Sequence, residues 1–364
     1  MDKFLARTAG MAPVSRAAAE AYDSRKGLLA ERVNQSLLAR PDLAQIIGST
    51  DAIELMQDNH RNHALFLTTV LHLNAFRLLA SVVPWVYRTY HQHGFSFSYF
   101  PVALNAWKQA VEKELPPAAA ADIVPVYDWM LAEHQNVIDL VSKLSAEKGV
   151  AMTGNAEGFL KSLLKQDLPD VIGLGEKNLN PGAALRLFYR DTMRPAMYEV
   201  GSRWARGEIS VAEEHLATAL AQTVVANMQA RSAASSGKRG RAIITAATNE
   251  QHDLGARMVA HAFETDDWEV IYLGANMPLS DLTHMARRTM PRFVGISLAM
   301  PYHLHHVKRI IDTFKSDGEL AQIKILVGGL VFAVFPEAAA CLPGALIVSD
   351  LEEALDLARG WSVG

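Results

Sequence analysis

The chain has 364 residues, half of them hydrophobic, so it is long enough for two or three domains with substantial cores. Its 35 basic and 39 acidic residues give a formal net charge of −4, which argues against a general phosphate-binding surface and against nucleic acid as a partner. The single cysteine, Cys341, excludes an intrachain disulfide and favours a reducing, cytoplasmic setting.

No uninterrupted apolar stretch reaches the roughly 20 residues that a membrane-spanning helix needs. Residues 79–87 (LASVVPWVY) are apolar, but this run is short and contains Pro84. The first residues lack the apolar core and the cleavage site of a signal peptide. We therefore expect a cytoplasmic protein that does not contact a membrane.

Residues 1–150 are predicted to form an all-helical domain of globin-like size, because apolar residues recur at helical spacing. The candidate core is residues 59–83, and His60, His63 and His72 are expected to lie on one long helix. An aromatic-rich segment follows it. The patterned segments are residues 59–83, 84–101, 102–115 and 120–144.

Residues 151–235 have apolar residues at three- and four-residue spacing in four segments with short polar joints, which predicts a four-helix bundle. Residues 232–241 (SAASSGKRGR) are small, polar and basic, as is typical of a linker. The four helical segments are residues 157–166, 168–179, 182–207 and 210–233.

From residue 240 to residue 364, five apolar segments alternate with helical patterns. This order predicts a Rossmann-like domain with a parallel five-stranded sheet that is covered on both faces. Ligands of such sheets bind at the carboxyl ends of the strands. The predicted strands lie in residues 242–248, 268–278 (a strand and then a loop that ends at Pro278), 293–300, 323–332 (a strand that ends at Gly328 and Gly329) and 345–350.

The turn after the first strand reads EQHDLG, and a histidine displayed at such a turn can ligate a metal. A serine follows the third strand, and a glycine pair follows the fourth. These motif residues are Glu250, His252, Gly255, Ser297, Gly328 and Gly329. Their spacing resembles that of the cobalamin-binding Rossmann-like module, and the resemblance covers about residues 240–360.

The resemblance implies that His252 replaces the cofactor's own base as the lower axial ligand of cobalt, and that the detached base is buried beside the sheet. Neutral imidazole suits cobalt, and a carboxylate from Glu250 or Asp253 would orient the ring. Ser297 would hydrogen-bond to the base. The other expected cofactor contacts are Gln251, Leu254, Gly255, Gly274, Gly328 and Gly329.

Two positions depart from the usual module. Glu250 stands where many members have aspartate, and Ala299 stands where leucine is usual. The alternative interpretation is an ordinary α/β domain with a histidine in a turn. Four spaced elements at one edge of the sheet favour the cobalamin site.

Trp204 is followed after nine residues by Glu214 and His215, a pattern that resembles the cap of the light-sensing adenosylcobalamin proteins, including light-responsive transcriptional repressors. The resemblance implies that Trp204 packs over the adenosyl group and that Val211 and Glu214 line the same pocket. An indole can cover an apolar ligand, and a carboxylate can bind ribose hydroxyls. Val211, Glu214 and His215 share one helical face. The alternative is a bundle with a buried Trp204.

The residue after that tryptophan is histidine in the repressors and Ala205 here. Alanine cannot become the upper cobalt ligand after illumination. His215 or water would have to take that position.

The N-terminal domain has no winged-helix pattern, so we do not expect a repressor. It resembles the photocobilins, in which a globin-like bilin-binding domain is joined to a cobalamin photoreceptor unit. Arginine and histidine suit propionates, and aromatic residues suit a flat conjugated ligand. The region has no cysteine, so biliverdin would be held non-covalently. The residues expected to contact it are His60, His63, His72, Trp85, Arg88 and Tyr90.

The alternative is that these residues bind no ligand. His60 and His63 would then be solvated, His72 would be hydrogen-bonded within the core, and the aromatic residues would be part of the hydrophobic core. A further cluster, His303, His305 and His306, lacks the spacing of a closed metal site and is expected to be a polar helix start near the cofactor.

The sequence therefore predicts a non-enzymatic photoreceptor that binds adenosylcobalamin and biliverdin. Light would break the cobalt–carbon bond and change conformation or assembly, with output through an unknown protein effector or homo-oligomerisation. The alternatives are a corrinoid carrier in a methyltransferase system and a haem-based sensor. The haem alternative predicts a Soret band that is lost in His72→Ala or His63→Ala.

Overall fold

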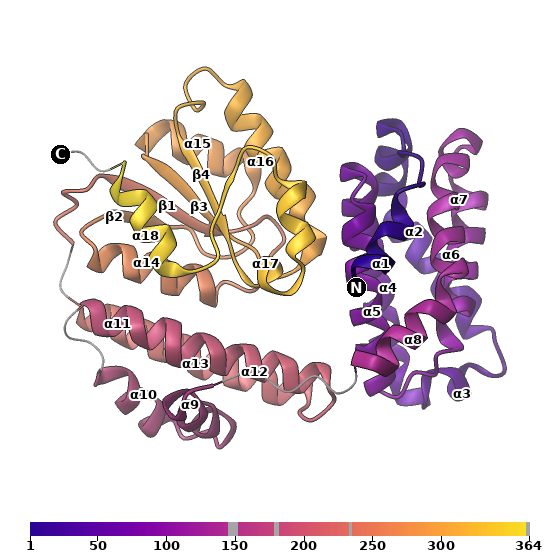
Figure 1. Ribbon diagram of the computed structural model, residues 1–364, viewed down its shortest axis with the longest axis horizontal. Coiled ribbons are helices and arrows are strands. Elements are labelled where there is room, and N and C mark those ends of the chain that lie inside the picture. The colour runs from indigo at the N-terminus through magenta and orange to yellow at the C-terminus, as the bar shows by residue number, and fades with distance from the viewer. Residues whose placement is uncertain (145–151, 178–181, 233–234, 362–364) are drawn as a thin grey trace. The chain divides into compact units, whose positions relative to one another are not determined.

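The computed structural model describes residues 1–144, 152–177, 182–232 and 235–361 (Figure 1). The chain divides into two compact units, residues 1–147 and 148–364. The domain boundary predicted at residues 150 and 151 lies outside the described residues. Within the described ranges, no helix has both the length and the apolar character needed to cross a bilayer.

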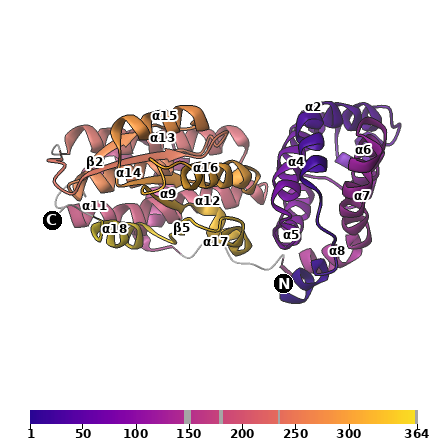
Figure 2. The same cartoon turned by 90° about the horizontal axis from the view of Figure 1, so that it is seen from above.

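The first unit is helical, as its apolar spacing predicted; a globin-like arrangement stays a prediction. Its helices are α1 (Asp2–Leu5), α2 (Arg16–Leu38), α3 (Leu43–Ile47), α4 (Ile53–Leu73), α5 (Phe76–Gln92), α6 (Tyr99–Glu114), α7 (Pro117–Ala132) and α8 (His134–Leu144). Helix α2 packs against α4, α6 and α7. Figure 2 shows α4 and α5 along one side of this unit and α6 and α7 along the other.

His60, His63 and His72 lie on one long helix, α4, as predicted, and the candidate core at residues 59–83 is divided between α4 and α5 at Asn74. Asn74 ends α4 with a left-handed φ of 49°, a conformation that asparagine tolerates better than most residues. Its side chain accepts a hydrogen bond from Val14 N at 2.7 Å and donates to Val14 O at 3.2 Å. A contact distant in the sequence therefore ends the helix. Pro84, in contrast, lies inside α5.

The second unit begins with the four-helix bundle, called the cap below. Its helices are α9 (Gly154–Leu164), α10 (Leu168–Glu176), α11 (Gly182–Phe188), α12 (Arg194–Ala205) and α13 (Val211–Arg231), with α11 and α12 joined by a π-helical turn at Tyr189–Met193. Phe159, Val200 and Val224 are fully buried in its core. The predicted bundle is thereby confirmed, with α11 and α12 acting as one bent helix.

The rest of the second unit is a parallel five-stranded sheet with strand order β2-β1-β3-β4-β5, as predicted. The central strands are buried because helices cover both faces. The strands are β1 (Arg241–Ala246), β2 (Glu269–Tyr272), β3 (Phe293–Ser297), β4 (Lys324–Gly328) and β5 (Leu346–Ile347). The helices are α14 (Leu254–Thr265), α15 (Leu279–Thr289), α16 (Leu304–Ser316), α17 (Leu330–Val334) and α18 (Leu351–Arg359).

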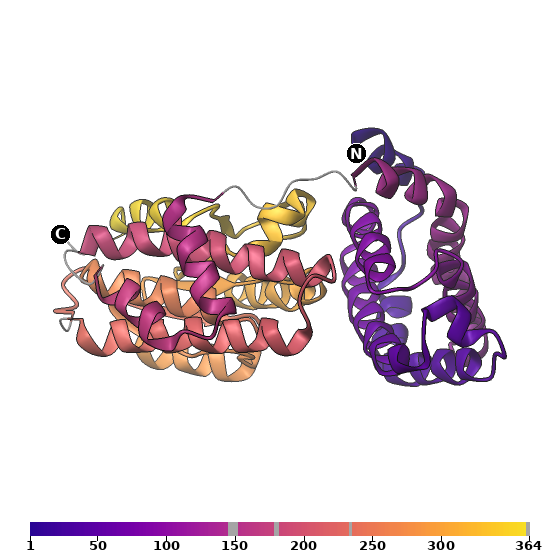
Figure 3. The same ribbon diagram turned by 90° about the horizontal axis from the view of Figure 1, so that it is seen from below.

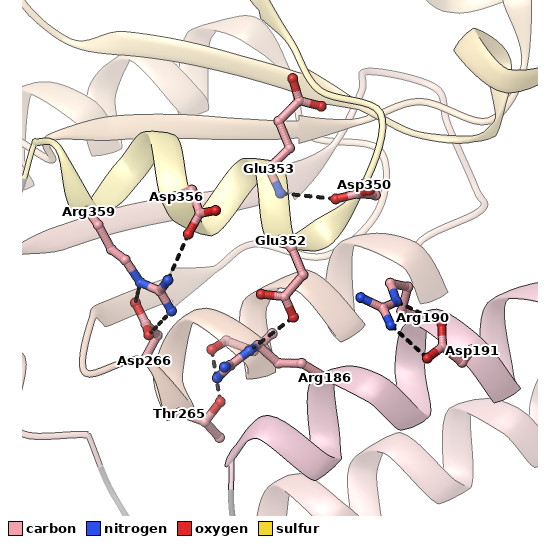
Figure 4. Close-up of polar contacts among 11 residues, drawn as sticks. Arg186, Arg190, Asp191, Thr265, Asp266, Asp350, Glu352, Glu353, Asp356 and Arg359 are labelled. Atoms are coloured by element: carbon pink, nitrogen blue, oxygen red, sulfur yellow. Dashed lines mark hydrogen bonds and ion pairs between the residues drawn. The ribbon is translucent and has the colours of Figure 1, made fainter.

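Figure 1 shows α14 and α18 on one face of the sheet and α15 and α16 on the other. The cap packs on the face that carries α14, as Figure 3 shows from the cap side. Leu254 and Met258 of α14 belong to the apolar core of the cap. Arg186 of α11 also donates to Glu352 of α18 at 3.2 Å (Figure 4). Cap and sheet domain therefore share one core.

Gly329 controls the exit of β4. Its φ of 128° is rarely adopted by other residues, and an added Cβ would overlap the backbone of Leu298. We expect Gly329→Ala to lower the free energy of unfolding by about 3 kcal/mol or more, because strain and overlap add. Gly274 is the matched control: its φ is 74°, but nothing lies within 4 Å of an added Cβ. We expect Gly274→Ala to cost about 1 kcal/mol.

Urea unfolding of the two variants and the wild type measures both values. Equal losses would contradict the overlap at Gly329 and leave backbone strain as the common cause.

Candidate functional site

The turn between β1 and α14 presents the predicted metal ligand. Asn249 has a left-handed φ of 65° and reverses the chain after the buried strand. Glu250 N then donates to Ala247 O at 3.0 Å, and Asn276 N from the loop after β2 donates to Glu250 O at 3.0 Å. Backbone hydrogen bonds therefore hold this turn at the carboxyl edge of the sheet.

His252 is held at one ring nitrogen and open at the other. Its Nδ1 atom lies 2.5 Å from Oε1 of Glu250, which also accepts from the His252 backbone N–H at 3.1 Å. The His252 side chain is 62% exposed, and Nε2 makes no hydrogen bond to any residue in the described ranges. A proton on Nδ1 leaves the Nε2 lone pair free, so Nε2 is the atom that can bind a metal.

Glu250 joins two loops of the sheet edge. Its Oε2 atom accepts hydrogen bonds from Ala299 N and Met300 N, each at 3.0 Å, in the loop after β3. Burial alone would raise the pKa of Glu250, but these contacts and those with His252 lower it to about 2. In turn the hydrogen bond from Glu250 raises the pKa of His252 in spite of its desolvation. The longer side chain of glutamate lets one carboxylate serve both loops.

The ligating side chains at this edge of the sheet suit a metal that is already bound within a macrocyclic cofactor. Among the described residues, no group of three or more His, Cys, Asp or Glu side chains could hold a metal ion by themselves. A single open imidazole can instead fill one axial position of a metal whose equatorial ligands come from a cofactor. His252 and its carboxylate therefore fit the corrinoid that the sequence predicted.

The predicted glycine and serine positions meet at the same edge. An added Cβ on Gly255 would lie 3.4 Å from Oγ of Ser297, so α14 and the end of β3 approach closely. A Cβ on Gly328 would lie 3.1 Å from Val348. The carbonyl oxygen of Gly274, in the loop after β2, accepts a hydrogen bond from Ala246 N at the end of β1 at 2.9 Å. The role of these residues toward a buried base stays a prediction.

Asp253, a candidate for orienting His252, has other partners. Its Oδ1 atom accepts from Gln222 Nε2 of the cap at 3.0 Å, and Oδ2 accepts from the Tyr272 hydroxyl at 2.9 Å. Leu254 lies in the core shared by cap and sheet, and Gln251 is exposed. Gln222 and Tyr272 were missed in the sequence because nothing in it pairs α13 or β2 with this turn.

The other residues predicted to contact the cofactor lie around the short connection between α12 and α13, residues 206–210. Trp204, partly buried, lies in the last turn of α12, and α13 begins at a capping box formed by Ser210 and Glu213. The first turns of α13 carry Val211, which is 49% exposed, and Glu214, which accepts from the Thr218 hydroxyl at 2.9 Å. The charge of Glu214 contributes to the raised pKa of His252.

His215 is exposed on the same turn. Its Nδ1 atom lies 2.9 Å from the carbonyl oxygen of Val211 and 3.3 Å from Oε2 of Glu214. The neighbouring Ala205 ends α12 and offers no ligand. The placement of His215 beside a bound cobalt stays a prediction.

The cluster His303, His305 and His306 lies at the start of α16. His303 and His305 are buried, and burial lowers the pKa of His303. The rings of His305 and His306 are 3.8 Å apart, and Nε2 of His306 lies 3.1 Å from Nδ2 of Asn249. His306 therefore contacts the turn that carries His252, and the expected place of the cluster near a cofactor stays a prediction.

In the first unit, His60 is buried and His63 is partly buried, and both rings contact polar side chains. His60 Nδ1 lies 2.5 Å from Asn34 Oδ1, and His60 Nε2 lies 2.8 Å from the Tyr99 hydroxyl. His63 Nε2 lies 3.3 Å from the Tyr127 hydroxyl. Burial lowers the pKa of His60 to about 4 and that of His63 to about 3. Both rings are therefore neutral and bonded to side chains of three other helices.

The remaining bilin candidates are spread over two helices. His72 lies on α4, and its Nε2 atom is 3.8 Å from Oδ2 of Asp23. Trp85, Arg88 and Tyr90 lie on α5 and are partly buried. Together with His60 and His63, the six candidates lie on α4 and α5.

Glu250 gives the cofactor-free protein a specific pH dependence. Its pKa falls from 4.5 to about 2 on folding, so the stabilisation is present above pH 4.5 and is lost as the pH falls toward about 2. The expected loss is about 3 kcal/mol. We expect Glu250→Gln to be less stable at pH 7 and to lack this acid-dependent loss.

Urea unfolding between pH 2 and pH 7 tests this, with Asp281→Asn as the control for the loss of an exposed carboxylate. If Glu250→Gln kept the wild-type acid dependence, the buried carboxylate of Glu250 would not be its source.

Comparisons with known proteins agree with the site geometry. Residues 240–358 match a family described as the B12 binding domain, and residues 156–228 match a second family described in the same words. The first match covers the sheet domain and the second covers the cap.

Curated relatives include dimethylamine corrinoid protein 3 of Methanosarcina acetivorans, 26% identical over 134 residues (36% of this chain, 63% of the relative). The dimethylamine corrinoid protein of Methanosarcina barkeri is 27% identical over 135 residues (36% and 63%). The HTH-type transcriptional repressor CarH of Myxococcus xanthus is 26% identical over 141 residues (39% and 46%). The chain thus covers less than two thirds of the length of each.

Similar solved structures include a cobalamin-binding protein from Desulfitobacterium hafniense, with TM-score 0.32, 18% identity and coverage of 57% of this chain and 98% of that chain. The monomethylamine corrinoid protein of Methanosarcina barkeri has TM-score 0.47, 16% identity and coverage of 57% and 97%. The two domain matches, together with the open imidazole of His252 at the sheet edge, identify residues 156–358 as a cobalamin-binding unit.

Proposed function

We propose that the chain is a light sensor that binds adenosylcobalamin between the cap and the sheet domain. His252 would hold cobalt through Nε2, and Trp204 would cover the adenosyl group. Bound adenosylcobalamin supplies a cobalt–carbon bond that visible light breaks. The chain responds by changing how the cap packs on the sheet domain, and it is not itself an enzyme.

The proposal is supported above all by the contact between helix α13 of the cap and the turn that carries His252. Gln222 of α13 donates to Asp253, the residue after His252, at 3.0 Å, and the same helix begins with Val211 and carries Glu214 in its first turn. Val211 is exposed at the start of the same helix. A ligand bound at His252 would therefore meet Glu214 and the neighbouring cap residues. The similarity to CarH over 39% of the chain is consistent with this arrangement.

The roles of the cap residues follow from their chemistry. The indole of Trp204 offers a flat apolar surface to an adenosyl group, and the carboxylate of Glu214 can accept hydrogen bonds from ribose hydroxyls. Loss of the adenosyl group would remove both interactions. The populations of the two cap arrangements would then shift by the difference in their affinity for the ligand.

After illumination, the upper cobalt position would be taken by His215 or by water. Ala205 has no ligating atom, whereas His215 is 72% exposed and bonded to the chain only through Nδ1 among the described contacts. If His215 takes this position, the spectrum of the illuminated His215→Ala protein differs from that of the wild type.

We also propose that the first unit binds biliverdin without a covalent link, since the only cysteine is Cys341 in the second unit. The aromatic residue of α5 that supports this is Tyr90, which is only partly buried and lies beside the stacked, buried rings of Tyr87 and Phe100. Arg88 on the same helix suits a propionate. Absorption would then extend to red light. The signal would pass to an unidentified protein effector or to self-association of the chain.

The second candidate function is a corrinoid carrier for methyl transfer. It is favoured by the dimethylamine corrinoid proteins among the relatives, which match about 36% of this chain. A carrier needs an upper face that its partner enzymes can reach, which a Trp204 lid would hinder. The two candidates therefore predict different preferences for the upper axial group.

The test is an absorption spectrum of the full chain reconstituted in the dark with adenosylcobalamin and biliverdin, before and after green light. We expect a red bilin band, bound adenosylcobalamin, and light-driven loss of the alkylcobalamin spectrum. Trp204→Ala should weaken binding of adenosylcobalamin by roughly tenfold or more relative to hydroxocobalamin, because it removes an aromatic contact to the adenosyl group alone.

The spectra test biliverdin binding and the light-sensor function separately. A photosensitive cobalamin without a bilin band would reject biliverdin and leave a sensor with one chromophore. Uptake of methylcobalamin with no preference for the adenosyl form would reject the sensor and favour the carrier.

A further inference from the structure

Helices α13 of the cap and α14 of the sheet domain are joined by two equivalent polar contacts. Gln222 Nε2 donates to Asp253 Oδ1 at 3.0 Å, and Gln229 Nε2 donates to Glu264 Oε2 at 2.8 Å. The two glutamines are seven residues apart, which is about two turns, so they share one face of α13. Val225 between them is fully buried.

At the end of this interface that is remote from His252, the buried His261 of α14 is hydrogen-bonded to two cap residues. His261 is fully buried, and its Nδ1 and Nε2 atoms each lie 2.7 Å from a hydroxyl, those of Tyr189 and Ser232. Tyr189 begins the π-helical turn between α11 and α12, and Ser232 follows the last residue of α13. Burial lowers the pKa of His261 to about 4, so the ring is neutral with both nitrogens satisfied.

The other end of the interface is built differently. Asp253 is partly exposed, lies in a turn, and directly follows His252. Its contact with Gln222 links that turn to the cap helix that also carries Val211 and Glu214. Its second contact, with the Tyr272 hydroxyl at 2.9 Å, ties the same carboxylate to β2. Any shift of the His252 backbone must therefore stretch or move the Gln222 contact.

We propose that Asp253 and Gln222 form a latch that couples the lower axial ligand to the cap, while Tyr189, His261 and Ser232 form a fixed pivot. This inference rests on cobalamin binding at His252 and deepens the proposed function. Gln222 lies eight residues beyond Glu214, about 12 Å along α13, so one rigid helix connects the latch to the adenosyl side. Asp253 is a positioning residue: it acts through its neighbour His252 and through α13.

The latch can be tested without any cofactor, by hydrogen–deuterium exchange of the full chain followed by mass spectrometry. Gln222→Ala should speed exchange of residues 249–257 by about fivefold, the factor expected from the loss of one hydrogen bond. The matched control Gln229→Ala removes the equivalent bond at the pivot end. It should leave residues 249–257 unchanged and speed exchange near residue 264.

A rescue experiment separates a specific latch from general loosening. Gln222→Glu places two carboxylates against each other and should open the turn further than Gln222→Ala. The double variant Gln222→Glu with Asp253→Asn restores an amide–carboxylate pair with donor and acceptor exchanged. It should bring exchange of residues 249–257 back toward the wild-type rate. Failure of this rescue, or equal effects of Gln222→Ala and Gln229→Ala, would overturn the latch.

Hydroxocobalamin binding adds a second readout. Gln222→Ala should weaken its affinity by about fivefold, and Gln229→Ala should leave it unchanged. An unchanged affinity in Gln222→Ala would show that the turn is not coupled to the bound cobalt and would overturn the proposal. Failure of the wild type to bind any cobalamin would contradict the proposed function instead, and the exchange experiment would still decide whether the latch exists.

Discussion

The hydrogen bonds of Glu250 are the constraint on which the candidate site depends. One buried carboxylate accepts from the ring and the backbone of His252 and from two backbone N–H groups after β3. It thereby fixes which ring nitrogen carries the proton and where the ring stands. Without it, His252 would be an exposed turn histidine with two competing tautomers, and the loops after β1 and β3 would lose their common anchor.

The second unit places the cap against the sheet domain, and the two share one hydrophobic core. At the carboxyl edge of the sheet, Gly329 and Gly255 have no side chain, which lets their backbones approach Leu298 and Ser297 closely. The cap meets the sheet domain along α14, whose first residues adjoin His252 and whose far end holds His261. A change at cobalt can therefore reach the cap through bonded neighbours as well as through the ligand itself.

Periodicity and motif spacing were sufficient to predict the parallel sheet, the helical bundle and the place of His252, because these depend on patterns local in the sequence. The sequence could not show that Asp253 bonds to Gln222 and Tyr272, since such pairings depend on how distant elements pack. The break at Asn74 was missed for the same reason: its partner, Val14, lies 60 residues away. His60 and His63 illustrate the limit for function, because their sequence does not distinguish ligand contacts from the polar side-chain contacts that they form.

Electron paramagnetic resonance of the cobalt(II) form shows whether Nε2 of His252 binds cobalt. Protein labelled with ¹⁵N only in histidine, loaded with cob(II)alamin, should show doublet rather than triplet splitting of the cobalt lines, because the axial nitrogen then comes from the protein. The splitting should revert to a triplet, or vanish, in His252→Ala. A triplet in the labelled wild type would mean that the cofactor keeps its own base, and would contradict the account.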